Sequence, residues 1–507
     1  MKKQNLAGTT AFLALMSGSG AFAQVTPEEV WQNWQDLSTS YGQTITATSA
    51  ARNGDTLKVE GVSITFSQDG TSVDGSIDKI NFRDLGDGTV EVTMSDSYPI
   101  KMTVPAVEGE EGSTATDLTI KVSQPGLVII AGGSTSETSY SFTAPSMGIK
   151  LTSIEGVDAG VVDATAEATL TGVSGNYLVG GDETAMTLAS SFAAQSMALA
   201  VVGSDKETQS DVRITATVAD LEGTTKGNFL GAEAMTDLAA ALKAGFNSEG
   251  SFSHGAVSFD VDVVDAGAPT KIMGSATSGN MTFALDSSQL KYGTGNKDVS
   301  ITVQSPDIPF PEVKVTYAEL GFNVLMPVAK TDAPADFAFL TKIVDLSISD
   351  EIWGMLDPTG SLPHDPATLV IDTKGSVTLT TDLMDEAQMA ALGETPPGEI
   401  HSLDVTELRA NVAGAALTGA GSFTFDNTDL TTFEGVPAPT GKIDLKLIGG
   451  NGLMDKLVAM GLLSEEDVMG ARMMLSMFAN AGPGADELNS TLEFKDKGFF
   501  ANGQQLQ

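Results

Sequence analysis

The sequence predicts a mainly β protein whose centre is a large, curved antiparallel sheet made of many hairpins. Runs in which apolar and polar residues alternate recur along the chain, for example at 62–66, 212–218 and 320–324. Turn-forming pairs such as Asn53-Gly54 and Asp87-Gly88 separate these runs. Alternation gives a strand one buried and one wet face, and an Asn-Gly or Asp-Gly pair is typical of a hairpin turn.

A short helix is expected before the strands and a helical hairpin near the end of the chain. Pro27 and Glu29 follow a capping threonine, which predicts a helix over 26–40. Residues 453–463 and 464–480 have the apolar content and the cap of two consecutive helices. Further short helices are predicted at 232–245, 336–346 and 383–392.

The first residues have the pattern of a secretory signal. Lys2 and Lys3 precede the short apolar run 11–16, and a small-x-small cleavage site ends at Ala23. The run is far shorter than the ~20 residues that span a bilayer as a helix. We therefore expect cleavage between Ala23 and Gln24, export to the periplasm and no transmembrane helix in the product, with peripheral association with the envelope as an alternative.

These patterns predict that the chain divides into three parts. Residues 1–23 are the signal peptide, and 24–328 form an N-terminal antiparallel β lobe. After a Pro-rich stretch, 335–507 form a C-terminal β lobe that contains the helical hairpin 453–480. A single continuous domain over 24–507 is the alternative.

Charge and cysteine content exclude several function classes. The formal charge is −39, and it would reach −41 after removal of Lys2 and Lys3 with the signal. Such acidity argues against nucleic acid as a partner. It is explained by solubility more simply than by cation binding. The chain has no Cys, which excludes thiol catalysis and Cys-ligated metal centres.

Catalytic motifs are absent from the sequence, so we assign no catalytic residue, metal ligand or cofactor. The three histidines, His254, His364 and His401, lie far apart, and no nucleophile elbow, zinc-protease motif or P-loop occurs. Asp87-Gly88 fits a hairpin turn better than half of a calcium loop. A secreted hydrolase using His364 or His401 remains an alternative.

The helix predicted at 464–480 is apolar on nearly every side. Core packing is the ordinary explanation of such a helix, and contact with an apolar ligand is the alternative. The candidate contact residues are Met469, Met473, Met474, Met477 and Phe478.

Two segments carry a resemblance to a known family. One runs from Trp353 to Ala367 and continues through Ile371-Asp372 to Gly375, and the other covers 492–505. In these segments the chain resembles an alphaproteobacterial envelope family catalogued as domain of unknown function 2125 (DUF2125). The resemblance implies the same layout of signal, helix and many strands. It implies no reaction, because the family has no established activity.

These observations favour a non-enzymatic exported envelope protein. A half-wrapped sheet can hold a lipid or another apolar ligand in a groove, and an envelope protein is the other partner we expect. The oligomeric state is left open. An outer-membrane β-barrel is an alternative, although aromatic residues make up only 6% of the chain and barrels need aromatic girdles.

Overall fold

The computed structural model describes residues 25–40, 42–68, 70–106, 114–134, 137–156, 162–182, 185–231, 234–393 and 395–507. The predicted cleavage site, Ala23 and Gln24, lies outside these residues.

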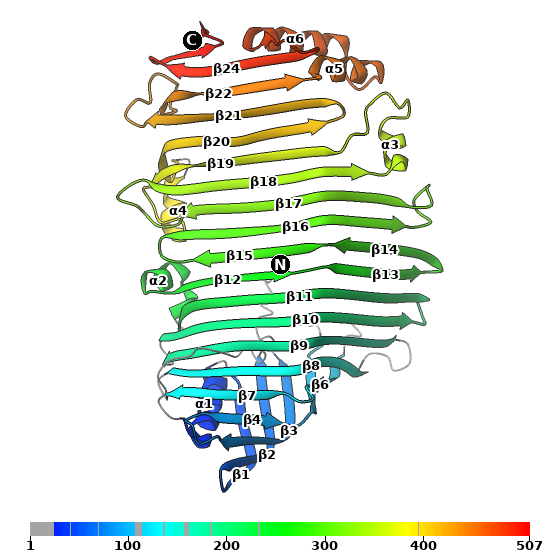
Figure 1. The fold of residues 1–507 in the computed structure, drawn as a ribbon, viewed down its shortest axis with the longest axis vertical. Coiled ribbons are helices and arrows are strands. Elements are labelled where there is room, and N and C mark those ends of the chain that lie inside the picture. Colours follow the sequence, from blue (N-terminus) through cyan, green and yellow to red (C-terminus); the bar gives the residue numbers. More distant parts are fainter. Residues whose placement is uncertain are drawn as a thin grey trace. The chain divides into compact units, whose positions relative to one another are not determined.

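The described chain is mainly β, with 26 strands assigned to one antiparallel sheet. This confirms the predicted fold class, including the N-terminal helix and the C-terminal helical hairpin (Figure 1). The helices are α1 (Pro27–Ser40), α2 (Leu238–Lys243), α3 (Asp350–Leu356), α4 (Glu386–Leu392), α5 (Gly450–Ala459) and α6 (Glu465–Phe478).

The strands divide between two compact units, which we describe separately. Unit 1 comprises the residues up to 235 together with 248–274 and 305–307, and unit 2 comprises the remainder up to 507. The first strands are β1 (Thr44–Asn53), β2 (Thr56–Gln68), β3 (Thr71–Asp84), β4 (Val90–Met94), β5 (Ser97–Val104), β6 (Thr116–Ser123), β7 (Val128–Ser134), β8 (Glu137–Glu155), β9 (Val162–Asp182), β10 (Ala185–Asp205), β11 (Ser210–Leu230), β12 (Asn247–His254), β13 (Val257–Asp265) and β14 (Ala268–Ala276). The later strands are β15 (Ser278–Leu285), β16 (Gln289–Gln304), β17 (Val313–Pro327), β18 (Ala335–Ile348), β19 (Ala367–Leu379), β20 (Gly398–Val412), β21 (Ala415–Asp426), β22 (Ala438–Ile448), β23 (Asn480–Ala481), β24 (Glu487–Lys495), β25 (Gly498–Ala501) and β26 (Gln504–Gln505).

Unit 1 is an antiparallel meander in which most strands pair with a strand that follows closely in the sequence. β4 and β5 together cover the length of β3, and β6 and β7 together cover the length of β8. The long strands β8, β9, β10 and β11 then pair in order. The connections from β1 to β2 and from β10 to β11 are short turns, as expected for antiparallel neighbours.

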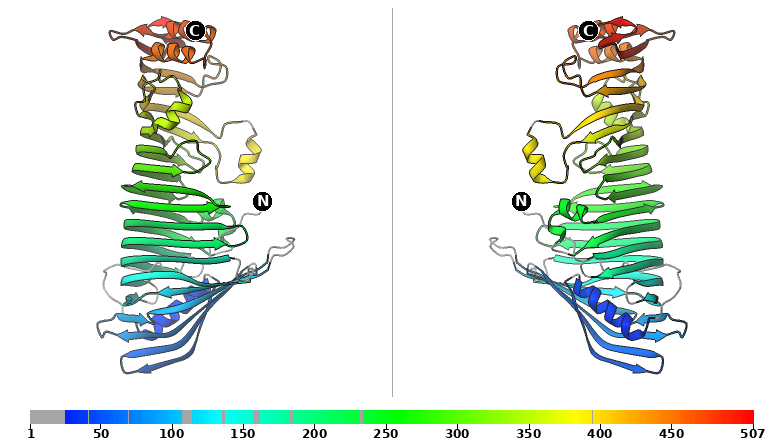
Figure 2. Two further views of the ribbon diagram at one scale, coloured as in Figure 1. Left: turned by 90° about the vertical axis from the view of Figure 1, so that its right-hand side faces the viewer. Right: turned by 90° about the vertical axis from the view of Figure 1, so that its left-hand side faces the viewer.

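Helix α1 covers one face of the first strands, where the core of unit 1 lies (Figure 2). The rings of Trp31 and Trp34 lie 5.9 and 5.4 Å from that of Phe82 on β3. The hydroxyl of Tyr140 on β8 donates to Asn33 Oδ1 at 2.5 Å. Residues under the helix are almost fully buried, which the amphipathic pattern of 26–40 predicted.

Several of the long strands contain a residue in the left-handed backbone region near their middle. In unit 1 these are Gly61, Gly172 and Asp220, with φ of 60°, 58° and 50°. At this level a residue pair drops out of the ladder, as between Ala194–Leu221 and Ser196–Ala219. Gly and Asp tolerate positive φ better than other residues.

The missing pair shifts the alternation of side chains by one residue. On β11 the apolar positions are even-numbered up to Val218 and odd-numbered from Leu221 onwards. In unit 2, Asp298 and Asp345 have φ of 49° and 53°, and β17 changes from odd positions up to Tyr317 to even positions from Leu320. Both halves of each strand therefore present their apolar residues to the same side.

Unit 2 continues as a meander from β15 to β22, each strand pairing with the next (Figure 1). β22 then pairs with β24, β24 with β25, and β25 with β26. The helix predicted at 336–346 is wrong, because these residues lie in β18. The other short helices are present but shorter than predicted, as α2 and α4.

We predict that Gly172→Ala lowers the free energy of unfolding by about 1–2 kcal/mol, because an L-residue is disfavoured at positive φ. An added Cβ would also lie 2.5 Å from Gln195 Cδ. Urea unfolding followed by tryptophan fluorescence measures the change. Gly203→Ala is the matched control, since its Cβ would meet nothing closer than 4.0 Å. Equal stability of the two variants would contradict the argument.

Candidate functional site

The strongest candidate site is one face of the unit 2 sheet, which we call the apolar face. Directly paired residues of neighbouring strands point to the same side of a sheet. Following the register from β16 to β25 therefore assigns each side chain to a face. The apolar face carries Leu290, Tyr292, Leu320, Phe322, Val324, Met326, Phe337, Phe339, Ile343, Leu369, Ile371, Leu403, Val405, Leu408, Leu417, Phe423, Ile443, Leu445, Leu447, Leu488, Leu492, Phe494 and Phe499.

Ring contacts across strands support this assignment. Phe322 lies 6.2 Å from Tyr292 on β16 and 5.7 Å from Phe339 on β18, measured between ring centroids. Phe423 and Phe494 lie 6.1 Å apart although β22 separates their strands, because Gly441 stands between them in the register. The apolar face is therefore continuous across these strands.

None of the side chains named above is fully buried in the described structure. Leu379, which lies on the same face at the end of β19, is buried. Most of the named side chains are half-buried by their neighbours, and Leu369 is 40% exposed. Under α1 in unit 1, by contrast, Val59, Phe82 and Val92 are completely buried. The comparison indicates that the described residues of unit 2 provide no second layer over the apolar face.

The opposite face of unit 2 is mainly polar and carries paired charges, although Val370 is buried on it. Lys342 lies 2.7 Å from Glu319, and Lys446 lies 3.2 Å from Glu487. Arg409 Nε lies 3.0 Å from a Glu407 carboxylate oxygen. Such exposed pairs contribute little stability, but they make this face compatible with water.

Among the described residues, structure covers the apolar face near two of its borders. Near α2, Val328 and Leu379 are buried, and Lys243 of α2 binds Asp382 at 2.7 Å. Near the C-terminal strands, Phe494 contacts Phe433 at 5.6 Å and Phe499 at 4.9 Å.

The loop that carries Phe433 is held by Asp429. Its carboxylate accepts from Lys497 Nζ at 2.7 Å and from Thr432 Oγ1 at 2.8 Å. The Lys497 ammonium, followed by the Thr432 hydroxyl and amide, holds the pKa of Asp429 well below its ordinary value. This ion pair therefore fixes the loop beside the aromatic end of the apolar face.

Four of the five predicted ligand-contact residues, the methionines of α6, do not join the apolar face. Met469, Met473, Met474 and Met477 point to solvent and are 57–65% exposed. Phe478 lies at the end of the helix, with its ring 6.4 Å from that of Phe499. Contact of these residues with a ligand stays a prediction.

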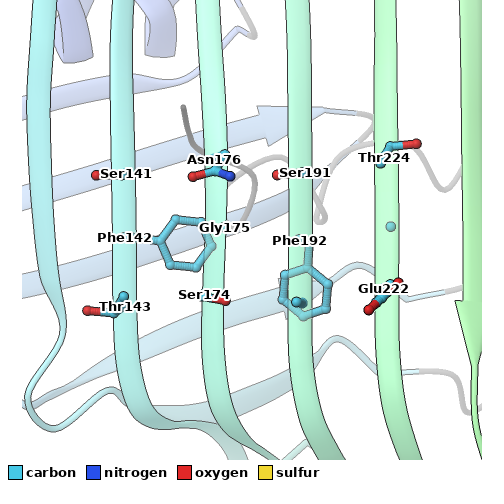
Figure 3. Close-up of a pocket in the computed structure, with 12 residues that line it drawn as sticks. Ser141, Phe142, Thr143, Ser174, Gly175, Asn176, Ser191, Phe192, Glu222 and Thr224 are labelled. Carbon is cyan, nitrogen blue, oxygen red and sulfur yellow. The ribbon is translucent and has the colours of Figure 1, made fainter. Parts of the chain in front are cut away.

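Unit 1 contains a shallow hollow of about 330 Å³ on its long strands (Figure 3). The ring of Phe142 lies against Gly175, where an added Cβ would come within 2.6 Å of it. The hollow is open. Gly175 stands between Phe142 and Phe192 in the register, and Gly223 lies on the other side of Phe192. The hollow has a defined shape, but its lining residues do not form a cluster of reactive side chains.

The histidines each have a local partner. His254 Nδ1 lies 2.9 Å from the Gly255 carbonyl, and His401 Nε2 lies 2.7 Å from Thr378 Oγ1. His364 stacks on Trp353, with ring centroids 4.6 Å apart. The Nδ1 atom of His364 also lies 3.4 Å from Asp350 Oδ1. None of these contacts gives one histidine both a nucleophile and an orienting acid.

Asp87 acts as a turn residue. Its carboxylate accepts from the amide of Thr89 at 3.0 Å and from the hydroxyl of Thr89 at 2.5 Å, and these bonds lower its pKa. Within the described ranges, no three His, Asp or Glu residues are grouped so that they could hold a metal ion. In the same part of the chain, every helix is too short or too polar to cross a bilayer.

A comparison with protein families identifies the part of the chain that carries the apolar face. Residues 266–501 match the family described as "Uncharacterized protein conserved in bacteria (DUF2125)". These residues are a DUF2125 domain. The match confirms the resemblance seen in the sequence, and every strand of the apolar face lies inside the DUF2125 domain. Comparisons with curated proteins and with solved structures found no match.

The sequence contains a signal for the apolar face that a search for simple alternation of apolar and polar residues would miss. The step from Tyr317 to Leu320 reveals the change of phase on β17. Cross-strand neighbours such as Phe339 and Thr373 could not be paired from the sequence, because register depends on distant residues.

We predict that Asp429→Asn lowers the thermal unfolding temperature at neutral pH. The difference in unfolding temperature between this variant and wild type should become smaller in acid. The pKa of Asp429 is lower in the folded protein than the ordinary value near 4. Its stabilising contribution is therefore present above about pH 4 and is lost as the pH falls towards the folded pKa. Thermal unfolding monitored by circular dichroism across this range measures it.

Lys497→Gln is the partner control and should give the same trend, since it removes the other half of the ion pair. A constant difference between wild type and Asp429→Asn at every pH would show that the charge of Asp429 is not responsible.

Proposed function

We propose that the protein is a non-enzymatic exported protein of the periplasm that binds the acyl chains of an amphiphile on the apolar face of its DUF2125 domain. One observation carries this proposal: a wide apolar face without a covering layer among the described residues of unit 2. An uncovered apolar surface of this extent commonly marks a binding site.

The energetics favour an apolar ligand. Each methylene group moved from water into an apolar environment contributes about 0.8 kcal/mol. About ten methylene groups, each covered on one side by the sheet, would contribute roughly 4 kcal/mol. Several acyl chains lying side by side would add to this, because each chain also buries its neighbour.

The dimensions of the face also suit acyl chains. Neighbouring strands are spaced by about 4.8 Å, so the strands from β16 to β25 present a face roughly 40 Å wide. An acyl chain occupies half of the ~30 Å hydrocarbon core of a bilayer. A chain can therefore lie fully on the face. The strong negative charge of the protein disfavours an anionic head group.

We expect native mass spectrometry of the full-length mature protein, purified from the periplasm without detergent, to show bound phospholipid or another amphiphile. Leu369→Asp should abolish this binding, because it places a charge on the apolar face between Ile343 and Ala410. Ile448→Asp is the matched control, since Ile448 is also 40% exposed but belongs to the polar face.

Thermal unfolding of both variants checks that they fold. A protein without bound lipid, even after incubation with envelope extract, would overturn the proposed function. Equal lipid binding by Leu369→Asp and Ile448→Asp would place the ligand elsewhere.

Export predicts a defined N-terminus. Intact mass of the protein from a periplasmic fraction should correspond to a chain that starts at Gln24 and has lost Lys2 and Lys3. Recovery of the uncleaved chain from the cytoplasm alone would contradict export, whatever the ligand of the apolar face.

A further inference from the structure

Helix α6 presents a row of methionine side chains to solvent. Met469, Met473 and Met477 follow at intervals of four residues, so they form one stripe along the helix, and Met474 lies beside it. All four are 57–65% exposed. We call these four residues the methionine stripe.

The other side of α6 is fixed, so the stripe has a defined orientation. Arg472 donates to Asp455 Oδ1 at 2.7 Å and to Asn451 Oδ1 at 3.0 Å, which ties α6 to α5 (Figure 2). Val468 is buried. The Phe478 carbonyl accepts from Ser490 Oγ on β24. The sheet and α5 therefore occupy the faces of α6 that the stripe does not use.

Negative charge borders the stripe. Glu465, Glu466 and Asp467 form the first turn of α6, and the last turn has no basic residue. The guanidinium of Arg472 is already paired with Asp455. Such a border repels an anionic lipid surface and attracts a partner with Lys or Arg beside its apolar residues.

Methionine suits a binding surface because its side chain is flexible and polarisable. A methionine-rich surface therefore adapts to different apolar partners. An amphipathic helix presents apolar anchors at intervals of three and four residues, which matches the spacing of Met469, Met473 and Met477. The combination of an adaptable apolar stripe and an acidic border therefore fits a partner helix that is both apolar and basic.

We propose that the methionine stripe binds a basic amphipathic helical segment of a partner protein. The apolar residues of that segment pack on the stripe, and its Lys or Arg residues lie near Glu465 and Glu466. This interaction is separate from ligand binding on the apolar face, because the four methionines lie on α6 and none of them belongs to a strand of that face.

The test uses the full-length mature protein and a synthetic peptide of Leu and Lys with Leu at helical spacing. Isothermal titration calorimetry should detect binding that weakens with salt. The triple variant Met469→Gln, Met473→Gln and Met477→Gln should weaken binding by at least about tenfold. A peptide of the same composition with alternating Leu and Lys should bind more weakly.

The matched control is Met281→Gln, Met355→Gln and Met389→Gln, which removes three exposed methionines outside α6. Circular dichroism verifies that both triple variants fold. Equal weakening by both variants, or by neither, would overturn the proposal in favour of general attraction to an acidic protein. If wild type instead binds phosphatidylcholine vesicles through the stripe and ignores the peptide, the partner is a membrane and the proposal fails.

Discussion

The side on which each strand places its apolar residues is the constraint on which the rest of this structure depends. Side chains alternate along a strand, so a shift of one residue would turn every later apolar side chain to the opposite face. Asp220 in unit 1 and Asp345 in unit 2 adopt positive φ at the level where a pair drops out of the ladder. The sequence changes phase at the same level, which keeps one face apolar.

The two units differ in what lies over that face. In unit 1, α1 covers the first strands, and its tryptophans pack on Phe82 to give a closed core. In unit 2, described residues such as Phe339 and Leu369 keep part of their surface accessible. A sheet of this kind is stabilised mainly by its ladder and by cross-strand contacts between side chains. A ligand that covers the face would add the missing layer.

Much of this fold could be predicted because its signals are local. Alternating runs, Asp-Gly turns and the cap at Pro27 specified strands, hairpins and α1. The error at 336–346 has a physical reason: Phe337, Phe339 and Leu340 make this part of β18 apolar on both faces, and the alternation is hidden. The apolar face itself could be predicted only from the strand register, which depends on pairs such as Leu320 and Ile343. The exposure of Met473 could be predicted only from the position of α6 on α5, and no local sequence pattern encodes that position.

The meander has a consequence for how the chain reaches its native state. Within each unit, most strands pair with a strand that follows closely in sequence, as β9 with β10 and β16 with β17. Closing a short loop costs little entropy, so such contacts can form early and quickly. The core around α1 comes first in the chain and offers a stable edge on which later hairpins can be added one at a time. Assembly can then proceed in the order of the chain, without waiting for its last residues.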